Sequence, residues 1–315
     1  MGGTGFFGKA FIKAFLSGRL SSWNVEELMI ASRNATAFGE ASKFNTVKKI
    51  SFFDIDLLQA QNMPHSDYLL HFATKSDSRI YQEDPSCQKA LIEQNMESFK
   101  NLVFRMKRPP KAILFASSGA VYGRQGIAGF NEDSELQSLD GLPLEKKAYG
   151  TGKRRAERTF TELSNHVRKI SIARCFAFCG PEIPLDQHFV AGNLIKNVLL
   201  QQRLLLHAKH EVIRSYLHSE DLVTWLMTVL ESGDQKCPIF NVGSDDSISI
   251  FELANFLSKY YGLPLDTNEH HSTEVDRYVP NIQKARLMGL TPSRTSLRTI
   301  IDTIEGLKNS GQICV

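Results

Sequence analysis

Short apolar runs that alternate with amphipathic segments constrain the fold of this chain more than any other feature. The apolar runs, rich in residues that favour strands, cover 28–31, 49–53, 68–72, 112–117, 170–174 and 239–242. Helical patterns cover 6–17, 86–105, 148–165 and 219–231. Strands that alternate with helices form βαβ units, in which the strands run parallel and helices cover both faces of the sheet. The sequence therefore predicts an α/β protein with a doubly wound parallel Rossmann sheet.

The later part of the chain is less regular and predicts a smaller C-terminal substrate-binding region. Helices are expected there at 185–202, 249–261 and 296–308. We assign residues 1–175 plus about 212–243 to a dinucleotide-binding domain, and about 176–211 plus 244–315 to the substrate-binding region. Because these two parts interleave along the chain, we expect no linker between them.

The segment Met1-Gly2-Gly3-Thr4-Gly5-Phe6-Phe7-Gly8 carries glycines at three-residue spacing and precedes a helical pattern. In such a turn Gly2 permits the tight bend, Gly5 lets the backbone approach a pyrophosphate, and Gly8 allows close helix packing. The helix N-terminus attracts the phosphates. A turn of this kind follows a central strand, which is apparently missing here, so we expect about six to ten further residues with a strand before it.

Two charged residues stand where a dinucleotide's adenosine end would lie. Arg33 follows the second predicted strand, where an acidic residue favours NAD and an arginine favours the 2′-phosphate of NADP. Asp54 follows the third strand and is either an adenine contact or a solvated turn residue. We expect NADP or NAD as the cofactor, with NADP favoured by Arg33.

Tyr149 and Lys153 are spaced i,i+4, so on a helix their side chains share one face. A nearby ammonium favours the phenolate form of tyrosine and so lowers its pKa, which makes the tyrosine a usable acid/base. About 30 residues upstream, Ser117 and Ser118 end a predicted strand. A hydroxyl there can bond the substrate oxygen that the tyrosine protonates.

Together these segments resemble the extended short-chain dehydrogenase/reductase family, in its nucleotide-sugar epimerase/dehydratase branch. The resemblance spans nearly the whole chain, and its ordered set of motifs is more specific than any one of them. Besides the glycine turn and Tyr149-x-x-x-Lys153, it rests on segments 71–74, 95–102, 117–123, 174–181, 214–221, 240–243 and 278–281.

The resemblance implies roles for individual residues. The implied catalytic set is Ser118, Tyr149 and Lys153, with Ser118 preferred over Ser117 because it lies four residues before Tyr122. The implied cofactor contacts are Gly2, Gly5, Phe6, Phe7, Gly8, Arg33, Asp54, Ala73 and Lys153. The implied substrate contacts are Ser118, Tyr149 and Arg214, the last at a diphosphate, whose geometry suits a guanidinium fork.

Two departures from the family pattern bear on the reaction. Nucleotide-sugar 4,6-dehydratases carry Asp-Glu after the catalytic hydroxyl, where this chain has Gly119-Ala120, so dehydration is not expected. The family's Arg-x-Phe-Asn has become Arg174-Cys175-Phe176-Ala177, which removes an asparagine that often meets substrate.

Three functions are therefore weighed. The first is a nucleotide-sugar 4-epimerase with a transient 4-keto sugar and Tyr149 as acid/base. The second is an NADPH-dependent reductase of a nucleotide 4-keto sugar, which Arg33 favours slightly. The third is a non-catalytic dinucleotide-binding protein, which the joint presence of Ser118, Tyr149 and Lys153 disfavours.

Composition limits the partners and the location. The 315 residues carry a net charge of +3, and the basic run Lys153-Arg154-Arg155 is read as a solvated helix face, so no nucleic acid is expected. Five cysteines at irregular spacing predict buried thiols such as Cys175 and Cys179, with no disulfide framework and no metal. No apolar stretch has membrane length and no signal peptide opens the chain, so we expect a cytoplasmic location and no membrane partner.

A homodimer is expected from the helices near 86–105 and 148–165. Apolar stripes occupy more than one face of each helix, at Leu91, Phe99, Leu102, Phe160 and Leu163. The resemblance implies that such helices pair into a four-helix bundle between two copies. The alternative is that both stripes pack only inside one copy.

Overall fold

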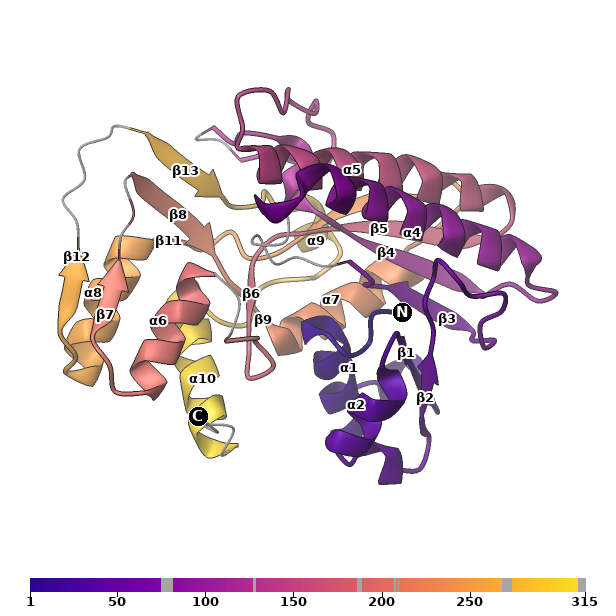
Figure 1. The fold of residues 1–315 in the computed structure, drawn as a ribbon, viewed down its shortest axis with the longest axis horizontal. Coiled ribbons are helices and arrows are strands. Elements are labelled where there is room, and N and C mark those ends of the chain that lie inside the picture. The colour runs from indigo at the N-terminus through magenta and orange to yellow at the C-terminus, as the bar shows by residue number, and fades with distance from the viewer. Residues whose placement is uncertain are drawn as a thin grey trace.

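A parallel four-stranded sheet with helices on both faces forms the larger part of the molecule (Figure 1). The computed structural model describes residues 1–74, 82–126, 129–185, 189–206, 208, 210–267 and 274–310. The sheet has the order β10-β5-β4-β3, and all of its pairs are parallel. Its strands are β3 (Tyr68–His71), β4 (Ala112–Ser118), β5 (Lys169–Cys175) and β10 (Ile239–Val242).

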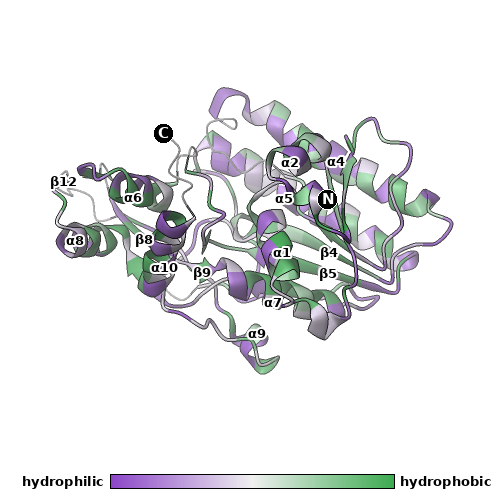
Figure 2. Ribbon diagram, turned by 90° about the horizontal axis from the view of Figure 1, so that it is seen from below, coloured by the Kyte–Doolittle hydropathy of each residue, from purple (hydrophilic) through white to green (hydrophobic). Residues whose placement is uncertain are grey.

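Side chains of β4 alternate between the two helix layers. Leu114 and Ala116 pack in one core cluster with α1 (Phe6–Leu16) and α7 (Ser219–Glu231). Ile113 and Phe115 pack in another with α4 (Pro85–Arg105) and α5 (Leu144–Thr161). This period of two, on a strand buried along its whole length, is what a doubly covered parallel sheet requires. In Figure 2 the hydrophobic colour runs along β4 and β5 between the helix layers.

A second parallel pair, β1 (Leu28–Ser32) with β2 (Ile50–Asp54), lies beside the large sheet. Backbone bonds of the first residues connect the two sheets: Gly2 N donates to Ala31 O at 2.8 Å, and Phe72 N donates to Met1 O at 2.9 Å. Met1 thus lies between β1 and β3. The expected strand before the glycine turn stays a prediction.

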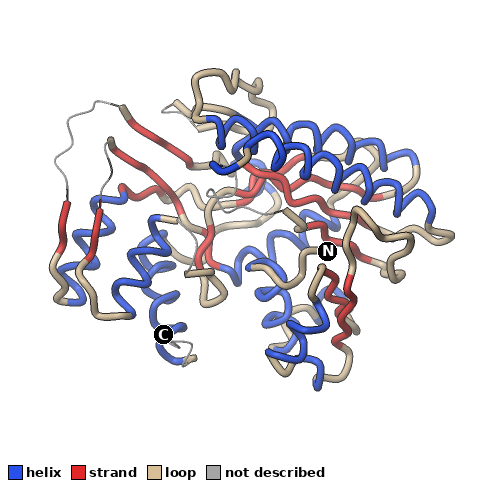
Figure 3. The backbone as a smooth tube through the Cα atoms, in the orientation of Figure 1, coloured by secondary structure: helices blue, strands red, loops and turns tan. Residues whose placement is uncertain are grey.

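The smaller region has its own core, formed by α6 (Val190–Leu199), α8 (Ile250–Tyr261) and α10 (Ser296–Asn309). Its short strands form sheets separate from the large one (Figure 3). They are β7 (Leu204–Leu206) with β12 (Leu265–Thr267), β11 (Ser247–Ser249) with β8 (Glu211–Ser215) and β13 (Val275–Tyr278), and β6 (Phe178–Cys179) with β9 (Leu217–His218).

Local signals explain where several helices begin and end. Ser249 and Glu252 form a capping box at the start of α8, and Gly262 ends that helix at φ +67°. Pro85 opens α4, where the Asp84 side chain accepts from Cys87 N. The remaining helical segments are short: α2 (Ala35–Ala41), α9 (Gln283–Leu287) and 3₁₀ turns at Ser21–Trp23, Phe44–Thr46, Gly119–Tyr122 and Glu162–Asn165.

The predicted α/β Rossmann class and the predicted strands and main helices are confirmed, with ends that differ by a few residues. The packing divides the chain somewhat differently from the predicted domains. Tyr216, just after β8, packs in the small core, whereas Leu217 packs in the large one. Ile282 and Ala285, around α9, also pack in the large core, although they follow residue 244.

Candidate active site

The glycine turn joins β1, β3 and α1 at close quarters. Gly2 has φ +75°, and a Cβ there would lie 2.7 Å from Ala73 N. A Cβ on Gly8 would lie 1.9 Å from Gly3 O. Gly5, in contrast, is exposed, with no neighbour nearer than Gly2 O at 3.6 Å from its ideal Cβ. Gly2 and Gly8 are therefore needed for packing, while Gly5 leaves space at the start of α1.

The N-terminus of α1 is suited to an anion. Its N-cap is Gly5, which supplies no side-chain cap, and its first turn holds no acidic residue. Its first N–H groups can therefore bind phosphate oxygens. The Phe7 ring faces the core, with the ring centroids of Phe72 and Phe178 each 5.2 Å away. Only backbone groups of Phe7 are therefore placed to contact a cofactor. Phe6 lies beside Phe7, 5.9 Å between centroids.

Arg33 and Asp54 lie at the carboxyl ends of the β1–β2 pair. Arg33 is exposed and forms no hydrogen bond or ion pair with any other described residue. The Asp54 side chain accepts from Thr36 N at 2.9 Å, and hydrogen bonds from Thr36 lower the pKa of its carboxyl group. Asp54 therefore holds the start of α2, a role that the sequence did not indicate.

The two serines at the end of β4 have different environments. Ser117 Oγ donates to Glu157 Oε1 at 2.5 Å inside the protein. Ser118 Oγ lies 3.1 Å from the Tyr278 hydroxyl oxygen, accepts from Ala120 N at 3.2 Å, and shares a hydrogen bond with Tyr149. Of the two hydroxyls, that of Ser118 meets the tyrosine of the predicted catalytic set.

Tyr149 and Lys153 lie on one face of α5, as their spacing predicts. The Lys153 ammonium lies 5.9 Å from the Tyr149 ring centroid. It donates to Thr74 Oγ1 at 3.0 Å and to Ala116 O at 2.9 Å, which places it beside Ala73 at the end of β3. The structure thus brings Ser118, Tyr149 and Lys153 together next to the glycine turn.

The expectation that Lys153 lowers the pKa of Tyr149 is wrong for this structure. Burial raises the pKa of Tyr149 to about 12, and only the hydrogen bond from Ser118 opposes that effect. Burial also lowers the pKa of Lys153 to about 8. Because both side chains sit away from solvent, each favours its neutral form.

The basic run on α5 is not the solvated face that its sequence indicated. Lys153 is buried, and Arg154 donates to Val121 O at 2.7 Å and to Gln137 O at 2.5 Å. Arg155 is exposed and donates to the Glu93 carboxylate. Of the three residues, Lys153 is buried, Arg154 is half-buried and only Arg155 is exposed.

A buried ion pair ties α5 to the strands, and sequence reasoning missed it. Arg174 on β5 donates to both oxygens of Glu157, with Nη2 2.8 Å from Oε2 and Nε 3.1 Å from Oε1. Ser117 donates to the same carboxylate. Glu157 lies four residues after Lys153, so its carboxylate fixes the helix turn that follows the ammonium. The signal in the sequence was a glutamate at i+4 from Lys153.

Gly119 has a structural reason to be glycine. A Cβ there would lie 2.6 Å from the Phe176 ring. An aspartate at this position would require that ring to move, so the absence of the dehydratase carboxylates matches the packing of this site.

Arg214 is engaged by an acidic residue. Its guanidinium donates to the Asp276 carboxylate at 3.0 Å and to the backbone oxygens of Ile213 and Asp276 at 2.9 and 2.7 Å. Lys146 donates to the same carboxylate at 3.0 Å. Asp276 thus lies between two cations, which sequence reasoning did not predict.

Other expectations also meet the structure. Cys175 and Cys179 are free and buried as predicted, and Cys314 lies outside the described residues. Among the residues that the structure describes, no cluster of three or more metal-ligating side chains occurs, and no helix has the length and apolarity to cross a membrane.

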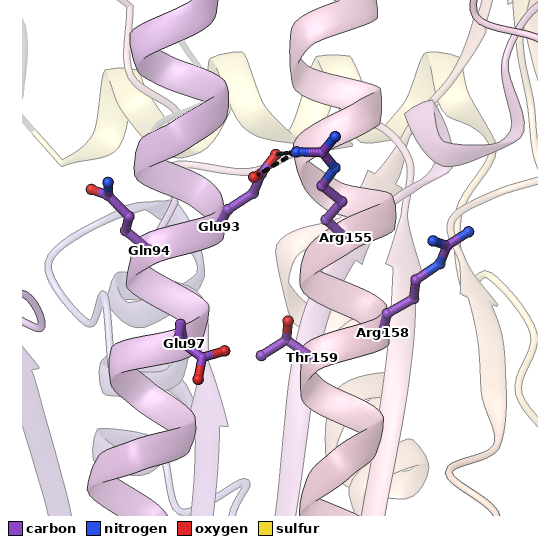
Figure 4. Close-up of a pocket in the computed structure, with 6 residues that line it drawn as sticks. All are labelled: Glu93, Gln94, Glu97, Arg155, Arg158 and Thr159. Atoms are coloured by element: carbon purple, nitrogen blue, oxygen red, sulfur yellow. Dashed lines mark hydrogen bonds and ion pairs between the residues drawn. The ribbon is translucent and has the colours of Figure 1, made fainter.

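Most of the apolar residues cited for a dimer do not face outward. Phe99, Leu102, Phe160 and Leu163 are buried within the chain, whereas Leu91 is half-buried. A groove on the outer side of α4 and α5 is instead polar, as Figure 4 shows. It is lined by Glu93, Gln94, Glu97, Arg155, Arg158 and Thr159. Four of the five residues therefore pack inside one copy, and the homodimer stays a prediction.

Comparison with known proteins identifies the family. A model of the NAD dependent epimerase/dehydratase family matches residues 1–243. The chain belongs to this family. It is accordingly an NAD(P)-dependent enzyme of the nucleotide-sugar epimerase/dehydratase type, and the non-catalytic alternative is set aside.

Curated relatives of this family member include decarboxylases and an epimerase. UDP-glucuronic acid decarboxylase 6 of Arabidopsis thaliana is 26% identical over 293 residues, covering 90% of this chain and 82% of that protein. ADP-L-glycero-D-manno-heptose-6-epimerase of Brachyspira hyodysenteriae is 24% identical over 276 residues, covering 82% and 80%.

Solved structures share the fold over nearly the whole chain. UDP-glucose 4-epimerase of Thermotoga maritima, with UDP-glucose, has a TM-score of 0.78 at 16% identity and covers 99% of this chain and 98% of its own. A double mutant of dTDP-glucose 4,6-dehydratase of Streptomyces venezuelae, with NAD bound, has a TM-score of 0.80 at 18% identity, covering 98% and 96%.

Proposed function

We propose that this enzyme is a nucleotide-sugar 4-epimerase that works through a transient 4-keto sugar, with Tyr149 as its acid/base. The observation that carries the proposal is the meeting of Ser118, Tyr149 and Lys153 beside the glycine turn. No carboxylate stands at Gly119 or Ala120, so the ketone would not lose water there.

The reaction needs one residue that carries a proton and one that hydrogen-bonds the sugar 4-oxygen. Ser118 donates a hydrogen bond to the sugar 4-oxygen, and Tyr149 takes the proton of the 4-hydroxyl. A bound nicotinamide supplies the acceptor for the hydride that leaves C4, and later the donor that returns it. After the ketone turns its other face, Tyr149 gives the proton back to the oxygen, so protons and hydride balance over the cycle.

Burial favours the protonated form of Tyr149 over the phenolate. With its pKa raised to about 12, the phenol is the resting form and is ready to donate. The base form is the phenolate, which the hydrogen bond from Ser118 favours because it lowers the pKa of Tyr149. Oxidation of the sugar is therefore the step that depends most on Ser118.

The residues at the glycine turn fit a dinucleotide. The uncapped start of α1 and the space at Gly5 would hold the pyrophosphate, with Gly2, Gly8 and Ala73 shaping the turn. Lys153 would hold a ribose. Arg33, exposed and unpaired among the described residues, would hold a 2′-phosphate, which favours NADP over NAD.

Arg214 would bind the diphosphate of the substrate. A guanidinium fork suits phosphate oxygens, and Asp276 and Lys146 beside it set the local charge. Relatives named for UDP, ADP and dTDP sugars support a nucleotide sugar as the substrate class.

A second candidate is decarboxylation of a nucleotide uronic acid. It is supported by the curated relatives named UDP-glucuronic acid decarboxylase, which match 90% of this chain. The first step is the same oxidation at C4. A 4-keto uronic acid carries its carboxylate β to the ketone, so the C–C bond electrons pass to an enolate as CO₂ leaves. A proton from water would then add at C5, C4 would take back the hydride from the reduced nicotinamide, and Tyr149 would give its proton to the 4-oxygen. The products would be CO₂ and a nucleotide pentose.

The test is a panel of UDP-glucose, UDP-galactose, UDP-glucuronic acid and dTDP-glucose with NAD or NADP, and of a nucleotide 4-keto sugar with NADH or NADPH, analysed by NMR and mass spectrometry. Inversion at C4 is expected. Loss of CO₂ would select the second candidate, and turnover only of 4-keto sugars with NADPH would select a reductase. No turnover under any condition would contradict both proposals.

A further inference from the structure

Strand β13 brings a second tyrosine to the catalytic serine. The Tyr278 hydroxyl oxygen lies 3.1 Å from Ser118 Oγ and 3.3 Å from the backbone oxygen of Cys175. Its ring packs on Phe176, with 4.7 Å between ring centroids. These contacts hold the ring in place, so the Tyr278 hydroxyl can donate its proton either to Ser118 Oγ or to the Cys175 carbonyl oxygen.

The same strand reaches both ends of the proposed substrate. Asp276, two residues before Tyr278, bonds Arg214 at the proposed diphosphate site. Side chains at i and i+2 of a strand lie on one face, about 7 Å apart. Tyr278 and Asp276 therefore lie on the same face of β13. Tyr278 is beside Ser118, where the sugar would react, and Asp276 is beside Arg214, where the diphosphate would bind.

Proton counting restricts what Ser118 can do. A serine hydroxyl has one proton and two acceptor positions. Ala120 N fills one acceptor position, and Ser118 also shares a hydrogen bond with Tyr149. When Ser118 turns its proton from Tyr149 to the substrate oxygen, the acceptor position that Ala120 does not fill faces Tyr278. That contact is favourable only if Tyr278 donates to Ser118, because otherwise two lone pairs face each other.

We infer that Tyr278 is a positioning residue for the proposed reaction: by donating to Ser118, it points the Ser118 proton at the substrate oxygen. The inference rests on the proposed function. Donors in a chain polarise one another, so the Ser118 bond strengthens as negative charge builds on the oxygen. The effect belongs to the transition state, so its loss should lower kcat more than it raises KM.

The variant is Tyr278→Phe, which keeps the ring on Phe176 and removes the hydroxyl. A neutral hydrogen bond is worth about three- to tenfold in rate, and we expect a loss of kcat of that size with KM nearly unchanged. The matched control is Tyr122→Phe. Tyr122 also packs near Phe176, at 6.4 Å, but its hydroxyl donates to Asn241 at 2.8 Å and has no bond to Ser118.

A double-mutant cycle with Ser118→Ala separates positioning from structure. If Tyr278 acts through Ser118, adding Tyr278→Phe to Ser118→Ala should cost no further kcat. An equal loss in both backgrounds, or no loss in the wild-type background, would overturn the inference and leave the proposed function standing. Absence of wild-type turnover on the nucleotide-sugar panel would overturn the proposed function and this inference with it.

Discussion

At the scale of single residues, burial of Lys153 shifts its pKa and so makes stability depend on pH. Lys153 is only 2% exposed and its pKa falls to about 8 because of burial. Burial disfavours the charged form of an amine, so the ordinary pKa of 10.5 applies to Lys153 only in the unfolded chain. The pH dependence of stability follows from that difference.

Between pH 8 and 10.5 the unfolded chain binds a proton at Lys153 that the folded chain has lost. The Lys153 contribution to the free energy of unfolding therefore rises with pH through this window. Urea unfolding of wild type and Lys153→Met should show the difference, wild type minus variant, increasing from pH 7.5 to 10. A difference that stays constant or falls would contradict the buried state of this lysine.

Arg33 should decide between the two cofactors. Arg33→Asp removes the partner of a 2′-phosphate and puts a negative charge in its place. We expect NADP affinity to fall about 10- to 100-fold, as for a charged hydrogen bond, and NAD affinity to change little. Fluorescence titration measures both, with Arg298→Asp on the surface of α10 as the charge-matched control. Equal losses for both cofactors would make Arg33 a bystander.

At the scale of elements, the buried pair of Glu157 and Arg174 anchors α5 against β4 and β5. Glu157 is 7% exposed and Arg174 is 4% exposed. The carboxylate receives donors from Arg174 and from Ser117, so each partner depends on the other. The helix that carries Tyr149 and Lys153 is thus fixed to the sheet by charge as well as by packing.

Removing one partner should cost more than removing both. Arg174→Met leaves Glu157 charged and buried, and we expect the free energy of unfolding to fall by about 3–5 kcal/mol. Arg174→Met combined with Glu157→Leu should be less destabilised than Arg174→Met alone, because no buried charge is then left unpaired. Chemical denaturation of all four proteins checks this. Additive losses would show that the two charges stand independently.

Some elements could be predicted from the sequence and others could not. Buried strands such as β4 and β5 carry continuous apolar runs, so their positions were predictable. The short strands β8, β11 and β13 depend on partners distant in sequence, and nothing local marks them. The same reason hid Tyr278 and Asp276, whose contacts with Ser118 and Arg214 form only when β13 pairs with β8.

At the scale of the whole molecule, the homodimer stays a prediction with a different basis from the apolar stripes. The outer groove places Glu93 and Glu97 on α4 beside Arg155 and Arg158 on α5 (Figure 4). A two-fold axis brings the same surface of both copies together, so Glu97 of one copy can face Arg158 of the other. Pairing by these charges would weaken as salt rises.

Light scattering at micromolar concentration should therefore give a dimer at low salt that dissociates at high salt. Arg158→Glu should shift the equilibrium toward monomer, whereas Arg203→Glu, at the distant pair with Asp266, should not. A monomer under all conditions would count against the dimer.

In the proposed reaction Tyr149 moves the proton while a sugar carbon exchanges hydride with the cofactor. The most direct measurement mixes excess enzyme, NAD or NADP, and each nucleotide sugar, and follows the absorbance of the reduced cofactor in one turnover. Wild type should show transient reduction. Tyr149→Phe should bind cofactor as well but react about 10²–10⁴-fold more slowly, the contribution of a general acid/base. Reduction by Tyr149→Phe at the wild-type rate would contradict the account.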